Sequence, residues 1–261
     1  MNARSKNSVK AIAIGFIMPV AFLVAWEILG RRGILNSSIF PTPSRIFTSF
    51  MDMVSRGRMQ KHLLISLLRV VKGFCVGSVL GLVIGTVIGL SNAANALMSS
   101  IIGLLRPIPM VAWIPVLILW LGIDEASKVT LIAIGTFWPV LINTSRGIKN
   151  SDRKLLEVGI ILEKTRLQML AKVVLPSAFP FIFTGLRLGV GSAWTCVVTA
   201  EAIAAASGIG YLIMYARELS QPPVMFSAVM TIAVVGLILD AILLRVEKRV
   251  LRWNEPDEER G

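Results

Sequence analysis

One apolar run in this chain, from Gly73 to Leu90, contains no charged residue and is long enough to cross most of a lipid bilayer. A transmembrane helix needs about 20 mostly apolar residues, because the hydrocarbon core is about 30 Å thick. Comparable runs recur along the chain, which predicts an all-α, polytopic membrane helical bundle with about six spans. The expected spans are Ala11–Leu29, Gly73–Leu90 with an extension towards His62, Leu97–Leu121, Ser127–Thr144, Ser177–Ala205 and Val224–Leu244.

The composition agrees with a chain that lies mostly in lipid and argues against several other classes. Hydrophobic residues make up 55% and charged residues 16%, whereas soluble domains carry about 25% charged residues. Lys and Arg outnumber Asp and Glu by 27 to 15. These basic residues lie mostly between the apolar runs, so they are expected to orient the chain in the membrane rather than to bind nucleic acid. One histidine and two cysteines favour neither a metal site nor a disulfide framework.

The basic connections predict that both termini lie on the cytoplasmic side. Lys and Arg gather in the first ten residues, in the connection from Arg146 to Pro176 and in the C-terminal tail, and positive charge favours the inside. The segment from Arg31 to Lys61 is also basic and would lie outside, but it carries fewer such residues. We expect an N-terminal tail at 1–10, a transmembrane domain at 11–247 and a C-terminal tail at 248–261. Residues 41–60 predict a short helix lying on the outer membrane surface.

Five glycines recur every fourth residue in the second predicted span, which places them on one helix face and lets a neighbouring helix approach closely. Static helix packing is one interpretation, and a seam on which helices slide during transport is the other. The glycines are Gly73, Gly77, Gly81, Gly85 and Gly89.

Three prolines interrupt the third predicted span, and three ionisable residues lie in the fifth and sixth predicted spans. Pro107, Pro109 and Pro115 break the backbone ladder, which is tolerated at membrane depth where protein or a water-filled cavity covers it. Arg106, beside this break, would either attract an anion or lie at the membrane face. Intramembrane charges are costly and usually face the bundle interior or a partner, which is one expectation for Arg187, Glu201 and Asp240. The alternative places Arg187 at the cytoplasmic interface, and Glu201 and Asp240 near opposite membrane faces.

The connection at 151–176 is too polar to span the membrane and too apolar to be a free loop. Its apolar residues Leu156, Ile160, Leu167, Leu170 and Val174 predict an amphipathic helix. Ser151 or Asp152 is the expected N-cap, and Pro176 is expected to end the helix before the fifth span. A short, partly apolar helix below the membrane is what a soluble partner would grip to move the membrane helices.

This connection resembles the cytoplasmic motif of permeases from bacterial binding-protein-dependent ABC importers. That motif reads E-A-A, three residues, G, nine residues, I-x-L-P. Glu157-Val158-Gly159 stands at its start, and Val173-Val174-Leu175-Pro176 at its end. Glu163 replaces the central glycine, which normally allows a bend. Because a positive φ costs a non-glycine residue about 1–2 kcal/mol, we expect either a bend that avoids this conformation or two more continuous helices.

The resemblance covers nearly the whole chain and extends to the nitrate, sulfonate and taurine branch. The stretches LGIDEASK, SGIGYL and LRWN are most similar to aliphatic sulfonate permeases, and taurine, nitrate or a related anion is the alternative cargo. The resemblance implies a type I importer fold in the bacterial inner membrane and a homodimer of this chain. It also implies two cytoplasmic ATP-binding subunits, which hold the ATP and Mg, and a periplasmic substrate-binding protein. The chain itself has no GxxxxGK[ST] loop, so it is expected to bind no cofactor and to catalyse no reaction.

Residues are expected in two roles, of which the resemblance implies the first. Coupling to the ATPase is expected from Glu157, Val158, Gly159, Glu163, Leu167, Val173, Leu175 and Pro176. The translocation pathway, between the third and fifth helices of two copies, is expected to include Arg106, Pro107, Pro109, Trp113, Trp194 and Glu201.

Two other functions compete with this interpretation. An ion-coupled secondary transporter would show related halves, which are not evident, and would have no use for a lever-like connection. A polytopic membrane enzyme would need His, Asp or Glu clustered near one face.

Overall fold

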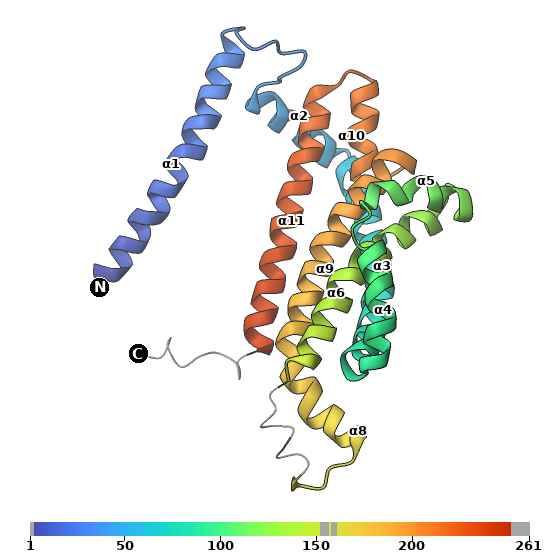
Figure 1. Ribbon diagram of the computed structural model, residues 1–261. Helices are drawn as coiled ribbons and strands as arrows, with labels where there is room; N and C mark the ends of the chain where they lie inside the picture. The colour runs from blue at the N-terminus through green and yellow to red at the C-terminus, as the bar shows by residue number, and fades with distance from the viewer. Residues whose placement is uncertain (1–2, 152–156, 158–160, 252–261) are drawn as a thin grey trace. The chain divides into compact units, whose positions relative to one another are not determined.

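In the computed structural model, which describes residues 3–151, 157 and 161–251, every regular element of the described chain is a helix (Figure 1). The all-α prediction is therefore confirmed for this part of the chain. The first half contains α1 (Ala3–Arg31), α2 (Pro43–Ser55), α3 (Arg58–Leu90), α4 (Asn92–Leu105), α5 (Met110–Leu121) and α6 (Glu125–Lys149). The second half contains α8 (Arg166–Met169), the π-helix η1 (Leu170–Val174), α9 (Leu175–Ala204), α10 (Ile209–Glu218) and α11 (Pro222–Val250).

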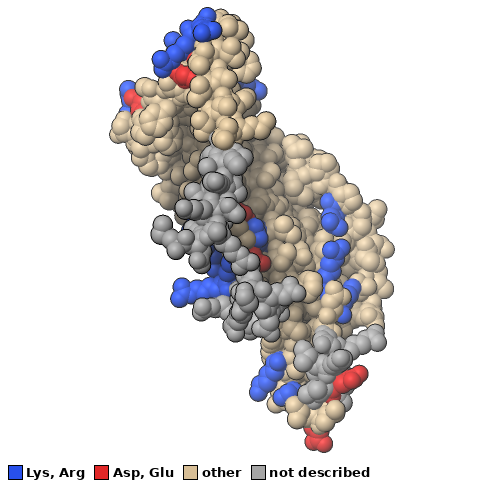
Figure 2. Space-filling view, turned by 90° about the vertical axis from the view of Figure 1, so that its left-hand side faces the viewer, with Lys and Arg blue, Asp and Glu red and all other residues tan. Residues whose placement is uncertain are grey.

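Four helical stretches of the described chain are long and apolar enough to cross a membrane, and a fifth span results if α4 and α5 count as one. The four are Arg58–Leu90, Glu125–Lys149, Leu167–Glu218 and Pro222–Val250. Uncharged residues cover most of the face seen in Figure 2, as expected for surfaces that meet lipid. The predicted first span lies within α1, which begins at Ala3 and so includes most of the segment expected to be a tail.

The predicted interruption of the third span is confirmed at Pro107 and Pro109 as a sharp bend, whereas Pro115 lies inside the continuous helix α5. The axes of α4 and α5 differ by 96°. Arg106 caps the end of α4, and Pro109 stands directly before α5. Pro107 and Pro109 lack a backbone donor and disfavour helix in the residue before them, so the helix ends here and restarts in a new direction.

The chain divides into two compact units, and the larger comprises residues 62–211 and 232–261. In this unit the glycine face of α3 lies against α6. A Cβ atom added to Gly85 would lie 2.8 Å from the carbonyl oxygen of Leu141, and one on Gly73 would lie 2.5 Å from Cβ of Ile132. These separations are too short for real Cβ contacts, so a side chain on this face would push α3 away from α6.

Helix α9 also packs against α6, through a second set of close approaches. A Cβ atom on Gly185 of α9 would lie 2.8 Å from Cβ of Asn143, and one on Gly147 of α6 would lie 2.7 Å from Cβ of Phe181. Buried apolar side chains of α3, α5, α6 and α9 complete the core of this unit around Leu131.

The smaller unit comprises residues 1–61 and 212–231. The short helix predicted within residues 41–60 is present in it as α2, whose first turn is capped by Thr42 accepting from the Arg45 amide at 3.4 Å. Ile46 and Met53 are buried, and Ser227 Oγ donates to the Ile46 carbonyl at 2.9 Å. Helix α2 is therefore a packed part of its unit.

The prediction that Pro176 ends the helix of the 151–176 connection is wrong. Helical geometry continues from Arg166 through η1 into α9, and Pro176 lies in the first turn of α9. A proline in a continuous helix loses one hydrogen bond and clashes with the preceding turn. The wider π turn at Leu170–Val174 lies where this disturbance falls, and π segments commonly absorb such breaks in the hydrogen-bond ladder.

Candidate functional site

A sharp turn centred on Glu163 divides the connection at 151–176. Leu162 and Glu163 form the turn, and Glu163 has a φ of +49°, in the left-handed region. The expectation that the bend would avoid positive φ, or that the helices would be more continuous, is therefore wrong. Glu163 adopts the conformation that glycine would allow, despite a cost of about 1–2 kcal/mol.

The restart of the helix after this turn explains how the conformation is held. The amide of Thr165 donates to Oε1 of Gln168 at 3.1 Å, and the amide of Gln168 donates to Oγ1 of Thr165 at 3.3 Å. This reciprocal pair is a capping box, which fixes a helix start and satisfies two otherwise free donors. The strained turn is thus followed immediately by a well-defined first turn of α8.

Three large apolar side chains in and beside this turn are exposed. Ile161 is 78% exposed, Leu162 61% and Leu167 77%. Glu157 is also exposed, whereas Asp152, Leu156, Val158, Gly159 and Ile160 lie outside the described residues. Large apolar side chains in a polar connection are typical of a surface that a partner covers.

The C-terminal end of the connection is fixed to the bundle. Val174 is buried together with Ile148 of α6 and with Ala178 and Ile182 of α9. Val173 and Leu175 are half-buried, and Pro176 is exposed. The exposed turn is therefore joined to α9 by an uninterrupted and anchored helical segment.

A second site, an ion-pair cluster, lies at the opposite end of α9. Arg69 of α3 donates from Nη1 to Oε1 of Glu201 at 2.8 Å, and from Nε to Oε2 of Glu125 at 2.8 Å. Ser66 Oγ also donates to Glu201 at 2.8 Å. The cluster joins α3, α6 and α9, so Glu201 has the interior partner expected of an intramembrane carboxylate.

Glu201 also organises the connection between α9 and α10. The amide of Gly210 donates to Oε2 of Glu201 at 3.0 Å, and Arg69 donates to the carbonyl of Ser207 at 2.6 Å. Gly208 has a φ of +112°, and a side chain there would collide with the Glu201 carboxylate. Both reasons require glycine at this position.

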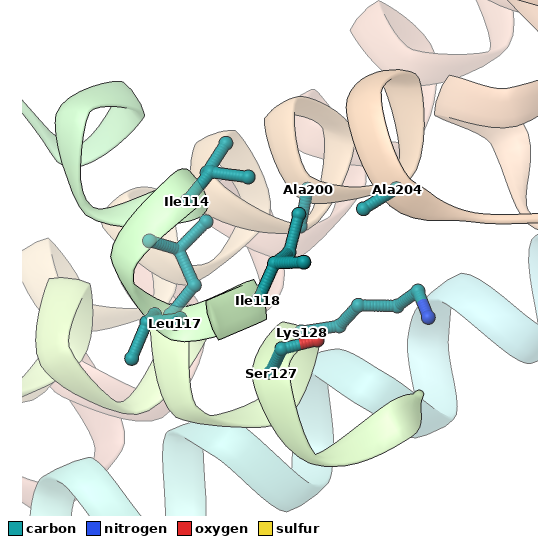
Figure 3. Close-up of a pocket in the computed structure, with 8 residues that line it drawn as sticks. Ile114, Leu117, Ile118, Ser127, Lys128, Ala200 and Ala204 are labelled. Atoms are coloured by element: carbon teal, nitrogen blue, oxygen red, sulfur yellow. The ribbon is translucent and has the colours of Figure 1, made fainter. Parts of the chain in front are cut away.

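Lys128 extends this polar region along the first turn of α6. Its ammonium group donates to the carbonyls of Ile123 and Asp124 at 2.8 and 3.0 Å. Its stem lines a cavity of about 10 Å³ between α5, α6 and α9, in which the ammonium lies away from Ile114 and Leu117 (Figure 3). A cavity of this size holds at most about one water molecule, so it is not a substrate pocket.

The structure divides the six predicted pathway residues among three places. Arg106, Pro107 and Pro109 are exposed at the bend between α4 and α5. Trp113 and Trp194 pack in the same apolar core, where Trp194 Nε1 donates to the Ile232 carbonyl at 3.1 Å. The sixth residue, Glu201, belongs to the ion-pair cluster.

Arg187 and Asp240 are partners. Nε of Arg187 donates to Oδ1 of Asp240 at 3.0 Å, and Nη1 donates to Oε2 of Glu247 at 3.3 Å. These bonds tie α9 to α11 and give both intramembrane charges a counter-ion.

Sequence reasoning missed the partners of these charged residues and the tip of the turn. Arg69 stands within LLISLLRVVKGF. An arginine in such an apolar run indicates that a buried carboxylate pairs with it. Ile161 and Leu162 stand between the two halves of the recognised motif. Nothing local in the sequence marked Glu125 as the partner of Arg69.

Comparison with known proteins decides the family of this chain. Residues 77–252 match the family described as binding-protein-dependent transport system inner membrane components. The chain belongs to this family. It is therefore a multi-pass inner membrane permease of an ABC importer, a component that lacks the ATPase domain and binds no cofactor.

Curated relatives of this ABC permease cover almost its full length. An aliphatic sulfonates transport permease protein of Bacillus subtilis (strain 168) is 39% identical, over 94% of this chain and 88% of the relative. The protein of the same name from Escherichia coli (strain K12) is 38% identical, over 92% and 91%. A bicarbonate transport system permease protein of Synechococcus elongatus is 31% identical, over 91% and 90%.

Solved structures place the permease in the type I importer fold. A chain of an inward-facing methionine ABC transporter matches with a TM-score of 0.62 at 18% identity, over 71% of this chain and 92% of that one. A chain of an amino acid ABC transporter crystallised with histidines matches with a TM-score of 0.64 at 19% identity, over 77% and 98%. Importers of this family combine the permease with ATP-binding subunits and a substrate-binding protein.

Proposed function

We propose that this permease translocates a small organic anion, an aliphatic sulfonate, into the bacterial cytoplasm. It acts as a homodimer with two ATP-binding subunits, which bind ATP and Mg, and with a periplasmic binding protein. Each chain crosses the membrane six times, with α1 as the first span and the bent α4–α5 pair as one span. Because the number of spans is even, both termini lie on the same side, which is the cytoplasm. The family membership supports the general activity.

The exposed turn at Ile161, Leu162 and Leu167 is the observation that carries the proposal. Its apolar tip would enter a groove on the ATP-binding subunit, with Glu157 and the motif residues around it completing the coupling surface. Because η1 joins α8 directly to α9, a displacement of the turn would be transmitted along α9. The α3–α6 glycine face then allows neighbouring helices to move without interlocked side chains.

The identity of the cargo rests on the relatives. Two permeases named for aliphatic sulfonates are 39% and 38% identical to this chain, and one named for bicarbonate is 31% identical. All three names denote anions. A sulfonate is therefore the first candidate, and taurine, nitrate or bicarbonate are the alternatives to be compared directly.

The transport test is uptake into proteoliposomes that contain the permease, its ATP-binding subunit and its binding protein. We expect import of methanesulfonate that requires all three components and internal ATP. Import by the permease alone, driven by an ion gradient, would support the secondary transporter instead. ATP-driven import of nitrate or bicarbonate without methanesulfonate would retain the importer and overturn the sulfonate assignment.

The coupling test replaces Leu162 by aspartate, which places a charge in the proposed apolar contact. We expect the substituted permease to lose co-purification with the ATP-binding subunit and to lose uptake, while its affinity for the loaded binding protein is unchanged. Glu157→Lys should act in the same way. Ile34→Asp is the matched control, since Ile34 is 66% exposed and lies far from the motif in sequence. Normal assembly and uptake by L162D would contradict the assigned coupling surface.

A further inference from the structure

The two edges of the Arg69 guanidinium have partners of very different exposure. The inner nitrogen, Nη1, is held by Glu201 and the Ser207 carbonyl. The outer edge donates from Nε to Oε2 of Glu125 at 2.8 Å and from Nη2 to Oε1 at 2.5 Å. The side chains of Arg69 and Glu201 are 4% and 0% exposed, whereas that of Glu125 is 60% exposed.

The contact between Arg69 and Glu125 has the geometry that arginine makes with a free oxyanion. Two parallel N–H groups meet the two oxygens of one carboxylate, a fork that carboxylates and phosphates accept equally well. A sulfonate also offers pairs of oxygens to such a fork. The outer edge of Arg69 therefore recognises a chemical group rather than one particular residue.

Replacing Glu125 by another anion at the outer edge of Arg69 should cost less free energy than leaving Arg69 without a counter-ion. A buried guanidinium left without an anion is strongly unfavourable, while an exposed carboxylate gains little from its ion pair. Glu125 is the first residue of α6 and follows the connection at Gly122–Asp124, so its side chain can turn outwards without moving the helix. A solute anion that replaced it would keep Arg69 paired throughout.

Nearby charges favour an anion when Glu125 turns away. Arg69 and Glu201 then balance one another, and Lys72 and Lys128 both lie close enough to Glu125 to interact with it electrostatically. Asp124 is the opposing charge beside Lys128. With the outer carboxylate displaced, cations exceed anions in this group by one, so an anionic solute restores the balance.

The cluster lies at the end of α9 that is remote from the exposed turn at Leu162 and Glu163. Glu201 is 26 residues after Leu175, which corresponds to about 39 Å of helix and exceeds the bilayer hydrocarbon thickness of about 30 Å. If the turn is cytoplasmic, as the proposed function requires, the cluster faces the side from which cargo arrives.

We propose that the outer edge of Arg69 is an oxyanion-binding site at the external mouth of the permease, in which Glu125 is the resident anion that an incoming sulfonate or carboxylate replaces. Arg69 supplies the recognition, Glu201 holds Arg69 in place, and Glu125 keeps the site occupied between transport cycles. The external location rests on the proposed function, but the exchange chemistry does not.

The test measures methanesulfonate binding to the full transporter complex in nanodiscs by isothermal titration, with acetate, sulfate and chloride as further probes. Glu125→Gln removes the resident anion and should tighten methanesulfonate binding by about tenfold. Acetate and sulfate should compete, since they carry paired oxygens, and chloride should not. Asp124→Asn is the matched control, because it removes one neighbouring carboxylate that is not among the hydrogen-bond partners of Arg69, and it should change binding by less than about twofold.

A second substitution shows whether the gain depends on the arginine fork. Arg69→Lys in the E125Q background should abolish the gain, because an ammonium group offers no planar pair of donors. Should that double variant fail to fold, Glu125→Asp provides the same test, since its shorter arm should weaken the resident contact and give an intermediate affinity. Equal effects of E125Q and D124N, or equal competition by chloride, would overturn the proposal.

The outcome can be separated from that of the proposed function. If the wild-type complex imports methanesulfonate but E125Q binds it no more tightly than wild type, the oxyanion site is wrong and the importer stands. If E125Q binds paired-oxygen anions through Arg69 but no sulfonate is imported, the site stands and the cargo assignment fails.

Discussion

Glu163 shows how a single residue can adopt the backbone that a glycine usually provides. Its φ of +49° lies directly before the capping box of Thr165 and Gln168. The capping box fixes the chain on the C-terminal side of the turn, and the left-handed conformation persists there despite its cost.

Glu163→Gly should therefore stabilise the exposed turn at Leu162 and Glu163. Removing the Cβ atom relieves about 1–2 kcal/mol of strain, offset in part by the greater freedom of glycine in the unfolded chain. We expect slower hydrogen exchange at the Met169 amide, which donates to the Thr165 carbonyl at 2.8 Å. Glu163→Ala is the control, because it removes the carboxylate but keeps the Cβ. Equal exchange rates in the two variants would show that the turn is not strained.

The buried member of the ion-pair cluster should matter far more for stability than the exposed one. Glu201→Gln leaves Arg69 without its interior counter-ion, and breaking a buried pair costs about 3–5 kcal/mol. Glu125→Gln removes an exposed partner and should cost less than about 1 kcal/mol. Thermal unfolding of the two variants in the same detergent measures the difference. Similar midpoints for both would contradict the burial argument.

At the scale of helices, the periodic glycines of α3 define how closely α3 approaches α6. Gly85 has the Leu141 carbonyl and the Thr144 side chain within 2.9 Å of a built Cβ. The regular spacing of four residues predicted a shared face, but the partner helix could not be known from α3 alone. It is the structure that places α6 against this face.

Gly85→Ala should separate the two helices and destabilise the bundle by about 1–3 kcal/mol, the usual range for overpacking. Gly103 of α4 is the matched control, since a Cβ there meets nothing within 4 Å. Gly103→Ala should be neutral or stabilising by about 0.5–1 kcal/mol through helix propensity. The measurement is the thermal midpoint of each variant. Equal midpoints for G85A and G103A would mean that the glycine face is loosely packed.

The helices themselves were largely predictable from hydropathy, while their ends and continuity were not. Predicted spans at 127–144, 177–205 and 224–244 correspond to α6, α9 and α11, because long apolar runs in lipid must be helical. The proline signal was correct at Pro107 and Pro109 and wrong at Pro176. The difference lies in η1, a π turn upstream of Pro176, and local sequence rules do not foresee such a turn.

At the scale of the whole permease, the sequence identified the family and the motif at 157–176 but not the site at the other end of α9. Motif spacing is a local property, and it led directly to Glu163 and Pro176. The Arg69 cluster joins residues separated by 56 and 132 positions. Only the folded bundle brings such residues together, and no short pattern within one segment indicates that Arg69 pairs with Glu125 and Glu201.

The two ends of α9 should lie on opposite sides of the membrane, and this arrangement decides whether the coupling turn can meet an ATPase. Leu162 lies at the exposed turn before α8, and Ala206 is exposed in the connection after α9. The chain has only two native cysteines, Cys75 and Cys196, so a background lacking both allows single cysteines to be placed at either end.

In that background, Leu162→Cys should react with a membrane-impermeant maleimide only after the membrane is opened, and Ala206→Cys should react in intact spheroplasts. Adding the ATP-binding subunit should protect the cysteine at position 162 and leave position 206 reactive, because the partner covers only the cytoplasmic turn. A cysteine at 162 that reacts from outside would invert the bundle. The exposed turn would then face the binding protein, the Arg69 cluster would face the cytoplasm, and neither proposed role could be retained.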